Sequence, residues 1–74
     1  MGDRIRRMRA REAEALLRRY GFEMISQKGS HRKWRHPQTH LQVVVPAHKG
    51  RQLPLGTLIS IMQNADIPER EWRD

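Results

Sequence analysis

The chain has 74 residues, which is enough for one small domain with a thin core and leaves no room for a large cofactor pocket, so no cofactor is expected. It has no cysteine, which excludes disulfides, thiolate metal sites and a cysteine nucleophile. Its formal net charge of +7 favours a polyanionic partner such as nucleic acid, although an arginine-rich surface that serves only solubility would have the same composition.

The N-terminal residues are basic, but no apolar run follows them as in a signal peptide, and no segment has the length needed to span a bilayer. We therefore expect a cytoplasmic protein that makes no contact with membranes. Residues 1–8 form a basic segment that either extends the first helix or forms a loose, disordered arm. Residues 9–74 are predicted to form a single domain, since they contain no linker and no repeat.

Residues 9–20 predict an amphipathic helix. Its apolar side chains have the spacing of one helical face and are Ala13, Leu16, Leu17 and Tyr20. Arginines and glutamates occupy the other sides. Gly21 comes directly after the last apolar residue and is the expected end of the helix.

Three short strands are predicted next. Residues 22–27 and 30–36 are joined by a tight turn at Lys28-Gly29, and residues 41–46 form the clearest strand, which ends at a proline. Because three consecutive strands with short connections usually pair with their neighbours, they predict an antiparallel meander.

The second strand has two different faces, because side chains alternate along a strand. If Trp34 points into the core, Arg32 and His36 share its side. The side chains on the opposite, solvated side are then His31, Lys33 and Arg35. This alternation places His31 in a basic neighbourhood that is open to a substrate.

Residues 54–65 predict a second helix, with Pro54 in the first helical position. Its apolar face is expected to consist of Leu55, Leu58, Ile59 and Met62. Residues 68–72 add a last turn that places Trp72 on the sheet.

The resulting order, α-β-β-β-α, predicts an α+β sandwich in which both helices cover one face of a three-stranded antiparallel sheet and the other face is left to solvent. Double-stranded-RNA-binding domains have this order of elements and bind by shape and phosphate contacts. A shared fold does not by itself assign a function.

Several motifs, spread over residues 9–72, together resemble one family. They are Gly21-Phe22, Gly29-Ser30-His31, Trp34-Arg35-His36-Pro37, Val45-Pro46-Ala47-His48, Leu55-Gly56-Thr57-Leu58, Ile61 and Ala65-Asp66-Ile67. In order and spacing the chain resembles the HicA toxins of bacterial and archaeal toxin–antitoxin systems.

The resemblance implies a small ribonuclease that cleaves mRNA without a metal and is held inactive by a HicB-type antitoxin. It also implies that the histidine of the glycine-serine-histidine motif is catalytic, which is His31 here, and that Gly29 is the turn glycine. The arginine-rich segment before Arg9 is longer and more basic than expected for the family, and it adds either RNA affinity or only solubility.

His31 suits the chemistry of RNA cleavage. The 2′-hydroxyl of RNA can attack the adjacent phosphorus once a base removes its proton, and a histidine titrates near neutrality. Lys28, Lys33 and Lys49 are candidates to stabilise charge on the phosphoryl oxygens, and Lys33 is favoured because it shares a strand face with His31. The residues expected to contact RNA are Lys28, Gly29, Ser30, Lys33, Arg35, His48, Lys49 and Arg51.

The other histidines have simpler interpretations. His36 and His40 flank a proline turn with no cysteine or suitable carboxylate nearby, so no metal site is expected. His48 either meets phosphate together with its basic neighbours or lies in a solvated loop. Trp34 and Trp72 are expected in the core rather than as platforms for stacked bases.

Two functions of other classes compete with a ribonuclease. One is a non-catalytic module that binds double-stranded RNA and leaves single strands intact. The other is an adaptor that binds only an acidic protein, and it would not retain RNA even at low salt. The glycine-serine-histidine motif favours the ribonuclease, because recognition of a duplex by shape needs cations but no histidine at this turn.

Overall fold

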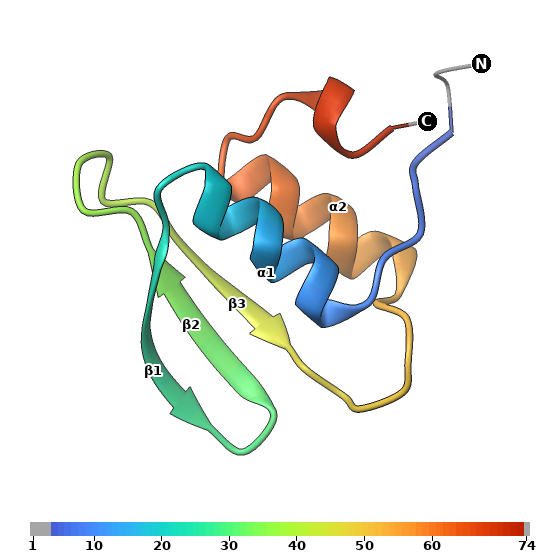
Figure 1. Ribbon diagram of the computed structural model, residues 1–74, viewed down its shortest axis with the longest axis horizontal. Helices are drawn as coiled ribbons and strands as arrows, with labels where there is room; N and C mark the ends of the chain where they lie inside the picture. The colour runs from blue at the N-terminus through green and yellow to red at the C-terminus, as the bar shows by residue number, and fades with distance from the viewer. Residues whose placement is uncertain (1–3, 74) are drawn as a thin grey trace.

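A computed structural model describes residues 4–73, and these form two helices and a three-stranded sheet in the predicted order. The elements are α1 (Ala10–Arg19), β1 (Glu23–Lys28), β2 (His31–Arg35), β3 (Gln42–Pro46), α2 (Leu55–Asn64) and a short 3-10 helix η1 (Glu69–Glu71). The sheet is antiparallel in the order β1-β2-β3, with both helices on one face (Figure 1). The α+β prediction is therefore confirmed.

Helix α1 forms where the sequence predicts it. Its buried stripe consists of Ala10, Ala13, Glu14, Leu16 and Leu17, which includes one carboxylate among the apolar side chains. Gly21 ends the helix with a φ of 91°, a left-handed conformation that costs glycine little.

The β1–β2 hairpin turns through Gly29 and Ser30, one residue later than predicted, because Lys28 still pairs with His31. Gly29 has a φ of 57°, and a Cβ at this position would meet nothing within 4 Å. This glycine therefore serves the conformation of the turn. β1 is exposed along its whole length, and it carries a bulge between Met24 and Ser26.

Helix α2 differs from the prediction in its start and in its buried face. Pro54 precedes the helix in an extended conformation, with ψ of 144°, and so is not its first helical residue. Leu55 is 41% exposed, and Ile61 takes the predicted place of Leu55 beside Leu58 and Met62. Ile59 is only partly buried against the core.

Trp72 is buried, but the turn that carries it lies beyond the helices as seen from the strands, so its predicted place on the sheet is wrong (Figure 1). Its indole Nε1 donates a hydrogen bond to the carbonyl of Ile67 at 3.0 Å. The same turn also contacts Tyr20, the residue that follows α1. The Tyr20 hydroxyl donates a hydrogen bond to the Glu71 carboxylate, and this hydrogen bond raises the pKa of Tyr20.

Residues 4–8 neither extend α1 nor form a loose arm. The amide of Arg6 donates to the carbonyl of Trp72 at 2.9 Å, and the amide of Leu53 donates to the carbonyl of Met8 at 2.8 Å. Met8 is fully buried. The remainder of the predicted basic segment, residues 1–3, lies outside the described residues. Within residues 4–73, no helix is long and apolar enough to cross a membrane.

Candidate functional site

His31 is the first residue of β2 and is held from both sides. Its Cα partners are Lys28 on β1 and Pro46 on β3, and next to it the amide of Ala47 donates to the carbonyl of Ser30 at 2.6 Å. The backbone of His31 is therefore fixed, whereas its side chain is exposed. Among residues 4–73, the His31 imidazole has no hydrogen-bond partner in this structure.

The predicted alternation along β2 holds. Trp34 is buried, Arg32 points to the same side as Trp34 and contacts α1, and His31 and Lys33 are exposed. Residues two apart on a strand lie roughly 7 Å from each other, so Lys33 is the nearest cation along the strand on the side of His31. We refer to the surface formed by the exposed Lys28, His31 and Lys33 and the half-buried Arg35 as the His31 face.

The opposite side of β2 is fixed by a buried carboxylate. Glu14 accepts a hydrogen bond from Arg32 Nη1 at 2.7 Å and another from Trp34 Nε1 at 2.9 Å. Sequence reasoning did not single out Glu14, although its position four residues after Ala10 and three before Leu17 places it in the buried stripe of α1. This contact attaches the strand that carries His31 to α1.

His36 has a structural role. Its Nδ1 accepts hydrogen bonds from the amides of Gln38 and Thr39 at 3.1 and 3.2 Å, and its ring packs edge-on against Phe22 at 5.2 Å. It therefore stabilises the β2–β3 turn from the core side, as the alternation predicted. His40 is exposed in the same turn with a φ of 65°. Within residues 4–73, no three side chains of the types that ligate metals gather in one place.

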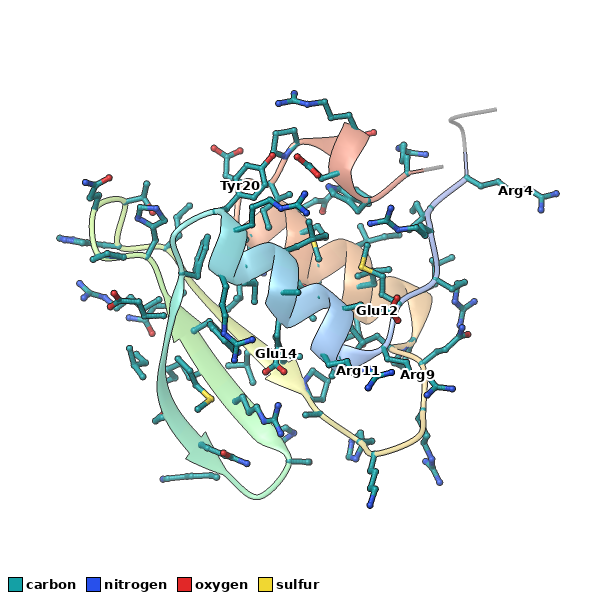
Figure 2. All side chains as sticks on the ribbon, viewed as in Figure 1. Arg4, Arg9, Arg11, Glu12, Glu14 and Tyr20 are labelled. Atoms are coloured by element: carbon teal, nitrogen blue, oxygen red, sulfur yellow. The ribbon has the colours of Figure 1, made fainter. Side chains whose placement is uncertain are left out.

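A basic groove of about 460 Å³ lies beside the end of the sheet where His31 pairs with Pro46. It is lined by Arg9, Ala10, Arg11, Arg32, Ala47, His48, Lys49, Gly50 and Arg51. Figure 2 shows Arg9 and Arg11 side by side at the start of α1, where the chain enters the helix. An isolated β-bridge between Arg9 and Gln52 holds this start against the loop that precedes α2.

The residues predicted to contact RNA thus fall into two groups. Lys28, Lys33 and Arg35 lie on the His31 face, and the turn of Gly29 and Ser30 lies at its end. The members of the second group, His48, Lys49 and Arg51, line the basic groove instead. Arg9, Arg11 and Arg32 also line the basic groove. Sequence reasoning did not place them there, because they come from the start of α1 and from β2.

Comparison with known proteins gives one family. The model of the family described as the HicA toxin of bacterial toxin-antitoxin systems matches residues 10–67, which covers both helices and all three strands. No curated protein gives a significant match to the chain.

Proposed function

Because the chain belongs to the family of HicA toxins of bacterial toxin–antitoxin systems, we propose that it is a metal-independent endoribonuclease that cleaves mRNA, with His31 as catalytic acid/base. A toxin of this kind has an antitoxin partner, and we propose that the partner is a HicB-type protein that blocks the His31 face.

The surroundings of His31 carry this proposal. Its backbone is held by strands on both sides, its imidazole is exposed with no hydrogen-bond partner among residues 4–73, and Lys28 and Lys33 lie on the same face. An exposed imidazole on a fixed backbone can take up and release a proton. The nearby ammonium groups favour the approach of a phosphodiester.

The reaction needs two contributions from these residues, removal of a proton and stabilisation of negative charge. His31 removes the proton from a 2′-hydroxyl, whose oxygen then forms a bond to the adjacent phosphorus. The bond from phosphorus to the 5′-oxygen breaks, and this oxygen takes a proton from solvent water while His31 returns its own proton to solvent, which leaves a cyclic phosphate and a 5′-hydroxyl. The Lys33 ammonium, and that of Lys28, stabilise the negative charge that grows on the phosphoryl oxygens.

The same positive charge supports inhibition by an acidic protein. A partner with complementary charge is attracted to the His31 face and excludes RNA by occupying it. The charge of the toxin therefore serves both substrate binding and inhibition.

A matched pair of histidine variants tests the proposal. His31 and His40 are both exposed, and Asn at position 40 tolerates the left-handed backbone there. Labelled single-stranded RNA is incubated in EDTA with the wild type, with His31→Asn and with His40→Asn. We expect His40→Asn to cleave at the wild-type rate and His31→Asn to be slower by about 10²- to 10⁴-fold.

Circular dichroism and thermal melting establish that both variants are folded. A folded His31→Asn variant that cleaves as fast as the wild type would contradict the proposal. Intact RNA with every protein, together with retention of duplex RNA, would identify a non-catalytic binding module instead.

A further inference from the structure

The basic groove has a strong positive charge, of which the protein neutralises only the part carried by Arg32. Arg9, Arg11, Arg32, Lys49 and Arg51 line it, and no acidic residue among residues 4–73 does. The carboxylates of Glu12 and Glu14 on α1 already have partners, a backbone amide for Glu12 and Arg32 with Trp34 for Glu14, which leaves most of this charge available to a ligand.

The engagement of those carboxylates is specific. Glu14 is buried and accepts hydrogen bonds from Arg32 and Trp34, so it offsets the charge of one lining arginine. Glu12 accepts a hydrogen bond from the backbone amide of Arg9 at 2.8 Å. The guanidiniums of Arg9 and Arg11, with Lys49 and Arg51, have no acidic partner among the described residues.

The size and lining of the groove indicate which part of a nucleic acid it takes. Its volume of about 460 Å³ lies in the range of about 300–1,000 Å³ found for sites that hold one small molecule, so it suits a nucleotide or two of one strand. Among the described residues that line the groove, His48 is the only one with an aromatic ring on which a base could stack. Such a surface binds phosphates and does not read bases.

The groove joins the His31 face at one end of the sheet. Arg32 follows His31 directly in β2 and points to the other side of the sheet. The loop of the groove begins where the amide of Ala47 donates to the carbonyl of Ser30, in the turn before His31. A strand bound in the groove therefore has a short path around the hairpin end to His31.

We propose that the basic groove is a second binding site, which holds the backbone phosphates of single-stranded RNA next to the nucleotide at His31. That the strand leads to His31 rests on the proposed ribonuclease function, whereas phosphate binding in the groove does not. The site contributes affinity without sequence preference.

The test measures binding of the full chain to a fluorescent 2′-O-methyl RNA of mixed sequence, which has no free 2′-hydroxyl and is not cut by the proposed reaction. The variant Arg11→Ala/Arg51→Ala changes two groove residues, and Arg4→Ala/Arg70→Ala removes the same two charges from exposed positions elsewhere. Circular dichroism checks that both are folded, and anisotropy gives Kd at several salt concentrations.

We expect the groove variant to raise Kd at least tenfold and the control variant to raise it less than threefold. Because log K for single strands changes with log salt by about 0.7 per phosphate contact, the groove variant should also lower the salt slope by about 1.4. The same groove variant should raise the KM for a cleavable RNA more than it lowers kcat.

Equal weakening by both variants would mean that only net charge matters, and no weakening by the groove variant would remove the site; either result overturns the proposal. A groove variant that binds RNA normally but loses affinity for a glutamate-rich peptide would also overturn it, in favour of an acidic protein. Groove-dependent binding of the uncut RNA, with no cleavage of ordinary RNA by any variant, would reject the ribonuclease and keep the groove.

Discussion

At the scale of single residues, the four histidines differ in what surrounds them. His36 uses Nδ1 to cap a turn and packs on Phe22, so its ring lies on the core side of the sheet, away from the His31 face. His31 has a fixed backbone and a free, exposed ring between lysines. The alternation along β2 was enough to predict this difference from the sequence, because Trp34 determines which side of the strand is buried.

Glu14 was not predictable in the same way. A glutamate in a helix is usually solvated, and the burial of this one depends on Arg32 and Trp34, which come from β2 and are separated from α1 in the sequence by the whole of β1. Only the folded structure brings these three side chains together.

The burial of Glu14 predicts a large loss of stability in Glu14→Ala. The change leaves Trp34 Nε1 without an acceptor and Arg32, whose side chain is 35% exposed, without its counter-charge. We expect the free energy of unfolding to fall by about 3 kcal/mol, measured by urea denaturation.

Glu23→Ala is the control, because Glu23 is exposed on β1, and it should change stability by less than about 0.5 kcal/mol. Similar stability of the two variants would show that the Glu14 contacts contribute little.

At the scale of elements, the helix ends and strand faces follow local rules, whereas the exact buried faces depend on packing. Gly21 predicted the end of α1 because a left-handed residue is needed there. In α2 the periodicity fitted Leu55 as well as Ile61, and the position of the helix against β3 decided for Ile61. The buried face of a short apolar helix is therefore less certain from sequence than its length.

Two glycine-to-alanine changes separate the effect of backbone conformation on stability from the effect of helix propensity. At Gly21 the φ is 91° and a Cβ would lie 2.8 Å from Nε2 of His36, so Gly21→Ala should lower stability by about 2 kcal/mol or more. At Gly56 in α2 a Cβ meets nothing within 4 Å, so Gly56→Ala should raise stability by up to about 1 kcal/mol.

Thermal melting of both variants checks this pair of expectations. Opposite shifts of the melting temperature are expected. A Gly21→Ala variant as stable as the wild type would show that the end of α1 does not need a left-handed residue.

At the scale of the whole molecule, eight of the fifteen lysines and arginines belong to the His31 face or the basic groove, two surfaces that meet at one end of the sheet. Composition predicted an attraction for polyanions, and the strand pattern predicted the His31 face. The basic groove could not be predicted, because its walls come from residues 9–11, from β2 and from residues 47–51. The bridge between Arg9 and Gln52 that joins the walls links parts far apart in the sequence.

The chemistry of the cut ends tests the central claim most directly. Single-stranded RNA is incubated with the wild-type protein in EDTA, and mass spectrometry identifies the ends of the products. Our account predicts 2′,3′-cyclic phosphate and 5′-hydroxyl ends, and no cleavage of RNA whose 2′-oxygens are methylated. Products with 5′-phosphate and 3′-hydroxyl ends, or cleavage of the methylated RNA at the same rate, would contradict attack by the 2′-hydroxyl and the role of His31 as its base.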